Sequence, residues 1–210
     1  MPKEVLTTKN LAVGYKNQRV VQDINFELKA GECCAIVGVN GIGKSTLLRT
    51  LAYLQPALEG DIEVNSTPLT NYSQSKLAQS IALVLTESIA TKNLTVKELI
   101  ALGRQPYTNW LGHLTNQDKS QIELCLATFQ LGSLQSRKCY ELSDGQLQRV
   151  LIAKAMAQDT PLILLDEPTT HLDLYHKIQI FKLLNALSHQ HQKNHFVHHP
   201  RDGLGHSIMR

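Results

Sequence analysis

The sequence lacks the features that mark several large classes of protein. It has no run of about 20 apolar residues, and residues 1–10 lack the apolar stretch of a secretory signal peptide, so we expect neither a membrane-spanning helix nor export. The four cysteines show no CxxC spacing, which argues against zinc and favours reduced, buried thiols in a cytosolic protein. Lysine and arginine form no runs and the formal net charge is only +3, so charge gives no support to nucleic-acid binding. With 42% hydrophobic and 19% charged residues, the 210-residue chain has the composition of a soluble globular protein.

The apolar residues are spaced as in a protein in which strands alternate with helices. Residues 33–38 form a continuous apolar run, typical of a strand buried on both faces, and further buried strands are expected at 80–85 and 161–167. Because strands and helices alternate, we predict an α/β core around a parallel sheet. The remaining predicted strands are 10–15, 19–28 and 60–64, and the predicted helices are 43–54, 95–103, 116–131, 142–158 and 174–190.

The strongest motif is "GVNGIGKS" at 38–45, which matches the phosphate-binding pattern G-x-x-x-x-G-K-[ST] between a buried strand and a helix. Its glycines let backbone N–H groups point at phosphate oxygens, Lys44 would reach the β- and γ-phosphates, and Ser45 would ligate Mg²⁺. A chance glycine-rich turn is the alternative, but the strand before it and the helix after it argue against chance. The residues predicted to contact ATP are Gly38, Val39, Asn40, Gly41, Ile42, Gly43, Lys44, Ser45 and Thr46.

A second motif, "LILLDEP" at 162–168, supplies the acidic groups that nucleotide hydrolysis needs. Asp166 follows a buried strand, at the edge where parallel sheets bind ligands, and would hold Mg²⁺ directly or through water. Glu167 is then placed to act as general base on the attacking water. Two solvated acids at an ordinary strand end are the alternative, which the phosphate-binding motif makes less favourable.

A third motif, "LSDGQLQRV" at 142–150, resembles the LSGGQ signature of the ATP-binding cassette (ABC) ATPases, and the resemblance covers about residues 4–190. It implies a P-loop NTPase fold: a RecA-like parallel sheet core, an N-terminal antiparallel β part and an inserted helical subdomain. It also implies that Ser143, Gly145 and Gln146 complete the ATP site of a second, antiparallel copy. A plain N-capped helix explains Ser143 but not the Gly-Gln that follows.

Further positions take their expected roles from the same resemblance. Tyr15 stands where the family stacks an aromatic ring on adenine, although a core or edge tyrosine is the alternative. Asp173 belongs to "HLD", which is similar to the loop that faces the partner subunit. Thr86 replaces the usual glutamine near Mg²⁺ or the lytic water, and we expect it to keep a weakened version of that role. Asp144 replaces a glycine of the signature, which is tolerable only if its carboxylate points away from the γ-phosphate.

The stretch "NLTVKELIALGRQPYTNW" resembles the helical subdomain of importers for iron-siderophores, haem and cobalamin. This implies an ATP-hydrolysing subunit that works as a homodimer under two membrane-spanning permease subunits, with a substrate-binding protein and no nucleic acid. It would lie peripherally at the cytoplasmic face of the inner (plasma) membrane. Two alternatives remain: a non-transport ABC ATPase, and a nucleotide-binding remnant without turnover.

The final stretch, 191–210, departs from the family. Where the resemblance implies an apolar strand and a switch histidine, the chain reads "HQKNHFVHHPRDGLGHSIMR", and we expect neither feature from it. Removing one A from an A-rich run that could encode 192–195 permits "KTILFTTHEMDLA", so our hypothesis is a single-base slip, natural or from sequencing. We therefore predict one ABC domain with an incomplete C-terminus, in which His198 and His199 do not replace the switch histidine. Its parts would be a core at 1–88 and 159–190, a helical subdomain at 89–158 and an aberrant tail at 191–210.

Overall fold

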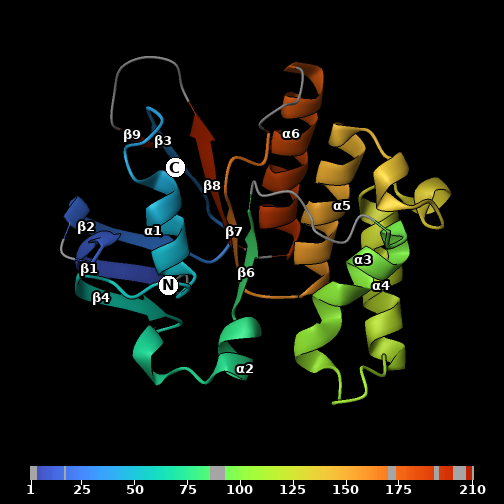
Figure 1. The fold of residues 1–210 in the computed structure, drawn as a ribbon, viewed down its shortest axis with the longest axis horizontal. Coiled ribbons are helices and arrows are strands. Elements are labelled where there is room, and N and C mark those ends of the chain that lie inside the picture. Colours follow the sequence, from blue (N-terminus) through green and yellow to red (C-terminus); the bar gives the residue numbers. More distant parts are fainter. Residues whose placement is uncertain are drawn as a thin grey trace.

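The computed structural model describes residues 4–16, 18–85, 93–169, 174–191, 194–200 and 207–209. Two sheets and a group of helices lie side by side (Figure 1). The first sheet and helix α1 occupy one side, the second sheet runs through the middle, and helices α3, α4 and α5 form the other side.

The first sheet is antiparallel, with strand order β2-β1-β4-β5. In β1, two runs of four residues are buried, and some of these residues, such as Leu6 and Leu11, belong to the core that α1 covers. The predicted strands at 10–15 and 19–28 are confirmed but begin earlier. The bounds are Glu4–Tyr15 for β1, Gln18–Lys29 for β2, Glu59–Val64 for β4 and Thr67–Pro68 for β5.

The second sheet carries the predicted parallel core, with strand order β6-β7-β8-β3-β9. Neighbouring strands are parallel except for β9, which pairs antiparallel with β3. All four residues of β7 are buried, as their continuous apolar run predicts. The bounds are Cys33–Gly38 for β3, Ile81–Val84 for β6, Leu162–Leu165 for β7, Asn194–Pro200 for β8 and Ser207–Met209 for β9.

Several of the α-helices begin at side chains that cap them. Thr95, Thr115 and Ser143 each form a capping box at the start of α3, α4 and α5, which satisfies otherwise unpaired backbone N–H groups. The α-helices are α1 (Lys44–Leu51), α2 (Gln74–Ala78), α3 (Val96–Ala101), α4 (Asn116–Thr128), α5 (Asp144–Ala157) and α6 (Leu174–His191). The 3-10 helices are η1 (Leu69–Asn71), η2 (Leu102–Tyr107), η3 (Gly132–Leu134) and η4 (Cys139–Glu141).

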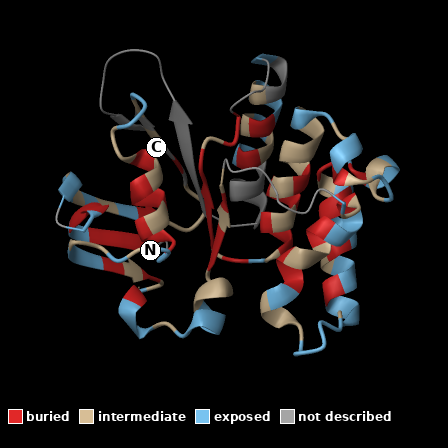
Figure 2. Ribbon diagram, in the orientation of Figure 1, coloured by how far each residue is buried: buried red, intermediate tan, exposed pale blue. Residues whose placement is uncertain are grey.

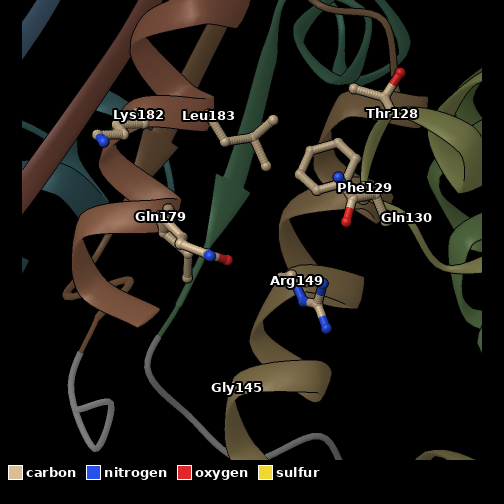
Figure 3. A pocket seen from close by; sticks show the side chains of 9 residues that line it. Thr128, Phe129, Gln130, Gly145, Arg149, Gln179, Lys182 and Leu183 are labelled. Atoms are coloured by element: carbon tan, nitrogen blue, oxygen red, sulfur yellow. The ribbon is translucent and has the colours of Figure 1, made fainter. Parts of the chain in front are cut away.

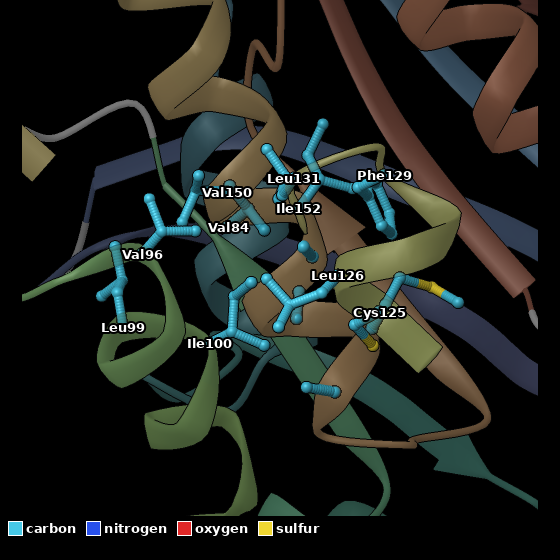
Figure 4. Packing of buried hydrophobic residues seen from close by; sticks show 14 of the residues in the cluster. Val84, Val96, Leu99, Ile100, Cys125, Leu126, Phe129, Leu131, Val150 and Ile152 are labelled. Carbon is cyan, nitrogen blue, oxygen red and sulfur yellow. The ribbon is translucent and has the colours of Figure 1, made fainter. Parts of the chain in front are cut away.

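Two hydrophobic clusters hold these layers together. One joins the first sheet to α1 and to one face of β7, through residues such as Leu48 and Leu164. The other joins α3, α4 and α5 to β6, the other face of β7 and α6, and is drawn in Figure 4. Figure 2 shows buried residues along the first sheet, along β7 and on the inner sides of the helices. Because β7 contributes to both clusters, it fixes the acidic residues that follow it.

The expectation that the tail supplies no strand was wrong. The backbone of Asn194–Pro200 forms β8, between β7 and β3, with Cys34 opposite Phe196 and Leu165 opposite Val197. Helix α6 returns the chain to the gap between these two strands, and a parallel ladder is made by backbone groups that every non-proline residue carries. The histidine-rich composition therefore did not prevent strand pairing.

Candidate functional site

The phosphate-binding motif forms a loop between β3 and the N-terminus of α1, as predicted. Gly41 and Gly43 have φ angles of 83° and 103°, a backbone conformation that L side chains rarely adopt. A Cβ at Gly43 would also lie 2.5 Å from Cγ1 of Val20 and 2.7 Å from Cγ2 of Val21. Glycine is therefore required at this position for two independent reasons. The N-terminus of α1, with its unpaired N–H groups, faces this loop.

Lys44 is held inside the loop. Its Nζ donates hydrogen bonds to the carbonyl oxygens of Gly38, at 2.8 Å, and Val39, at 2.7 Å, and the residue is 6% exposed. Burial lowers the pKa of Lys44, while the nearby carboxylates of Glu167 and Asp166 oppose that shift. The ammonium group thus lies between backbone carbonyls and acidic groups, where it is in reach of a phosphate entering the loop.

Ser45 and Asp166, which are 121 residues apart in the sequence, meet at the end of β7. The Ser45 hydroxyl donates to Oδ1 of Asp166 at 3.1 Å, and Asp166 is only 5% exposed. The backbone N–H of Asp166 donates to the carbonyl of Val84 at 2.8 Å, which ties the end of β7 to β6. A hydroxyl and a carboxylate are hard oxygen ligands of the kind Mg²⁺ prefers, so these two residues fit a magnesium ion.

Glu167 follows with a φ angle of 47°, in the left-handed region. For a residue with a Cβ, this conformation costs about 1–2 kcal/mol. Such strain is typical of residues whose side chain must point in one particular direction. Glu167 lines the same cavity as the phosphate-binding loop.

This cavity has a volume of about 250 Å³. Tyr15, at the end of β1, forms one wall; it is 52% exposed, and its hydroxyl accepts a hydrogen bond from Thr46 Oγ1 at 3.3 Å. Val20 of β2 also lines it and was missed by the sequence analysis, where the only available signal was its position in a strand close to Tyr15. The lining residues are Tyr15, Val20, Asn40, Gly41, Gly43, Lys44, Ser45, Thr46 and Glu167.

The signature residues lie elsewhere. Ser143 caps α5 by accepting a hydrogen bond from the N–H of Gln146, and both Ser143 and Asp144 are exposed. The cavity at the phosphate-binding loop is lined by none of the predicted signature residues, which are Ser143, Gly145 and Gln146. Within one copy of the chain, the structure therefore does not bring the two motifs together.

A separate cavity of about 360 Å³ lies where α4, α5 and α6 approach one another (Figure 3). Gly145 and Arg149 of α5 line one side, Lys182 and Leu183 of α6 the other, and Phe129 closes it near the end of α4. The Nε of Arg149 is buried and has no hydrogen-bond partner.

Two predicted site residues, Thr86 and Asp173, lie outside the described residues, so their roles stay predictions. Among the helices that the structure describes, none is long and apolar enough to cross a membrane.

Comparisons with known proteins agree with the three motifs. The family model described as ABC transporter matches residues 21–170. The chain is 39% identical over 188 residues to the achromobactin transport ATP-binding protein CbrD of Dickeya dadantii (strain 3937), covering 90% of this chain and 70% of that protein. It is 37% identical over 183 residues to the iron(3+)-hydroxamate import ATP-binding protein FhuC of Bacillus subtilis (strain 168), covering 87% and 68%.

Among solved structures, a metal-chelate type ABC transporter in an inward-facing conformation matches with a TM-score of 0.80 and 31% identity, over 93% of this chain and 73% of that one. The predicted fold class, an α/β P-loop NTPase with a helical subdomain, is therefore confirmed. The chain belongs to the ABC transporter family, whose ATP-binding subunits are P-loop ATPases.

Proposed function

We propose that this chain binds and hydrolyses ATP to power an importer of the iron-siderophore, haem or cobalamin class. The observation that carries the proposal is the convergence of Lys44, Ser45 and Glu167 at one cavity, with Asp166 hydrogen-bonded to Ser45. Relatives named for achromobactin transport and iron(3+)-hydroxamate import support the class of cargo.

The charge and position of each residue in the cavity suit it to a different role in ATP binding or hydrolysis. The N–H groups of the loop and of the α1 N-terminus bind the phosphates, and Lys44 neutralises part of their charge. Ser45 and Asp166 would hold Mg²⁺, which supplies further positive charge next to the transferred phosphoryl group. Glu167 accepts the proton of the attacking water, and Tyr15 offers its exposed ring to the adenine.

The signature at the N-terminus of α5 is proposed to act in a homodimer. Ser143 and Gly145 do not line the cavity of their own copy, and Ser143 is exposed, so it is free to meet the nucleotide of a second copy. Asp144 is exposed in the first turn of α5, where its negative charge would oppose a phosphate nearby. We expect closure of this dimer to require that the Asp144 carboxylate point away from the phosphates.

Two permease subunits would use the energy of ATP hydrolysis to move the cargo, and a substrate-binding protein would deliver that cargo. An apolar cavity of about 520 Å³ between the end of α1, α2 and β6 is a suitable docking site for a permease segment. Leu54, which lines this cavity, is 63% exposed and is therefore accessible to such a segment. The chain would then lie peripherally on the cytoplasmic face of the membrane.

The decisive experiment is ATP turnover by the purified chain, with Glu167→Gln as the test variant and Glu27→Gln as the control. Glu27 is an exposed carboxylate on β2 outside the cavity, so its substitution should leave the rate unchanged. Turnover that falls at least a hundredfold in Glu167→Gln, with ATP binding retained, supports the proposal. ATP binding without turnover in the unmodified chain would favour the second candidate, a nucleotide-binding remnant.

The cargo class needs a separate test in cells that lack the gene for this chain. Uptake of radiolabelled ferric siderophore should return when the chain is supplied and should not return with Glu167→Gln. Unchanged iron uptake in the absence of the chain would contradict the proposed cargo class.

A further inference from the structure

The loop between η2 and α4 exposes two large apolar side chains. Trp110 is 91% exposed and Leu111 is 57% exposed, and they are neighbours at the tip of this loop. Trp110 is also the single tryptophan of the chain. Exposing an indole so fully is unfavourable in water, and such paired apolar residues commonly mark a surface that meets another apolar phase.

The loop is held in one shape by its own hydrogen bonds. Oδ1 of Asn109 accepts from the N–H groups of Leu111 and His113, each at 3.1 Å, and the N–H of Gly112 donates to the Asn109 carbonyl at 2.9 Å. Gly112, with a φ of 73°, completes the turn. The two apolar side chains are therefore presented outward by an ordered turn, which lowers the entropy cost of binding through them.

Both ends of the loop are anchored. On the η2 side the Arg104 guanidinium stacks on the ring of Tyr107, 4.0 Å from its centroid. On the α4 side, Thr115 and Asp118 form a capping box, and Asp118 also accepts a hydrogen bond from Arg104 at 2.8 Å. One buried ion pair thus fixes both ends of the loop, so the tip cannot readily fold back onto the protein.

Exposed charges close to the tip in the sequence are few. Between residues 99 and 122 the only carboxylate is that of Asp118, which is 2% exposed and paired with Arg104, and the exposed acids Glu98 and Glu123 flank this stretch. Lys119 and His113 are exposed in the same stretch. Asp159 is an exposed acid at the η2 end of the loop, where its carbonyl oxygen accepts a hydrogen bond from the Tyr107 hydroxyl at 3.5 Å.

The position of the loop leaves it uncovered. It lies at the end of the molecule opposite the N-termini of α1 and α5, and therefore away from the ATP site and the proposed dimer contact (Figure 1). The C-terminal end of α1 and helix α2, which line the proposed permease site, lie toward the same end. None of the three cavities described above is lined by residues 108–114, so the loop presents a tip and not a groove.

We propose that this loop inserts Trp110 and Leu111 into the interfacial layer of an anionic phospholipid bilayer. Tryptophan is favoured at that layer because its ring is apolar and its N–H can still meet water or headgroups. Lys119, exposed near the start of α4, adds attraction to anionic headgroups. The choice of a membrane as the occupant rests on the proposed function, because a subunit working under a permease stays close to the bilayer; the insertion itself does not require ATP turnover.

The test uses the full chain and the fluorescence of its single tryptophan. Vesicles of phosphatidylcholine with phosphatidylglycerol are added, and we expect the emission maximum of Trp110 to shift to shorter wavelength. We also expect quenching by lipids brominated on their acyl chains, and weaker binding to pure phosphatidylcholine or in high salt. No shift with any vesicle composition would overturn the proposal, and a shift only with vesicles that contain the permease would overturn it in favour of a protein partner.

Variants distinguish insertion of the loop tip from non-specific adsorption of the protein to vesicles. Leu111→Ser should weaken partitioning into vesicles about tenfold, as should Trp110→Ala measured by sedimentation. Leu124→Ser is the matched control, because Leu124 is 49% exposed on α4, away from the tip, and should not affect partitioning. Equal losses in Leu111→Ser and Leu124→Ser would contradict the proposal. ATP binding is measured in the same samples. If the protein inserts into vesicles but does not bind ATP, the result contradicts the proposed function and leaves the membrane proposal standing.

Discussion

Gly43→Ala should be the most damaging single-methyl substitution in the phosphate-binding loop. The φ of 103° at Gly43 would cost an alanine about 1–2 kcal/mol. Its Cβ would also lie 2.5 Å from Val20 and 2.7 Å from Val21, and overpacking of this kind costs about 1–3 kcal/mol. The expected loss in the free energy of unfolding is therefore about 2–5 kcal/mol.

The chain offers two matched controls for this substitution. Gly41 and Gly112 also have positive φ angles, but a Cβ at either would meet nothing within 4 Å. Gly41→Ala and Gly112→Ala should thus carry the strain without the clash, and cost about 1–2 kcal/mol each. Gly112→Ala should keep full ATP affinity, because Gly112 lies outside the cavity.

Urea unfolding of the three variants, together with ATP affinity, tests this reasoning. The double variant Gly43→Ala/Val20→Ala should recover part of the lost stability, since it removes one of the two clashing side chains and leaves the backbone strain and the contact with Val21. The reasoning is refuted if Gly43→Ala is no less stable than Gly112→Ala, or if removing the Val20 side chain gives no recovery.

Three further substitutions test other parts of the account. Asp118→Asn should destabilise the chain by about 3–5 kcal/mol, since it leaves Arg104 buried without its ion partner. Hydrogen bonds from Thr115 lower the pKa of Asp118 in the folded state. The carboxylate therefore stabilises the fold above the pKa of the unfolded state, and this stabilisation is lost as pH falls through the lower folded-state pKa. Asp118→Asn should make the free energy of unfolding depend less on pH in that range, as measured by urea unfolding between neutral and acid pH. Thr95→Ala should cost about 0.5–2 kcal/mol through loss of the α3 cap, seen as a lower thermal midpoint. Ser45→Ala should weaken the dependence of ATP binding on Mg²⁺, measured by titration with and without the ion.

Much of the fold and the site could be predicted because local patterns specify them. The continuous apolar run at 33–38 predicted β3 with its bounds, and the motif after it predicted the loop and α1. The pairing of Ser45 with Asp166 follows from the same logic, since the carboxyl ends of parallel strands meet at one edge.

Other features depend on tertiary context that no local pattern contains. Strand β8 forms from a histidine-rich segment because β7 and β3 offer free backbone groups on both of its sides. Val20 lines the site only because β2 packs over Gly43. Helix α1 ends at Leu51, before the predicted 54, because Tyr53 takes a left-handed φ of 58°. The boundary between the core and the helical part stays a prediction, because residues 86–92 lie outside the described residues.

The central claim is that Glu167, held at the cavity in a strained conformation, is the base that makes this chain an ATPase. The most direct measurement is single-turnover hydrolysis of radiolabelled ATP by the unmodified chain and by Glu167→Gln, with ATP affinity determined for both. The account predicts the same affinity and at least a hundredfold slower hydrolysis in Glu167→Gln. Equal rates of hydrolysis in the two proteins would contradict it.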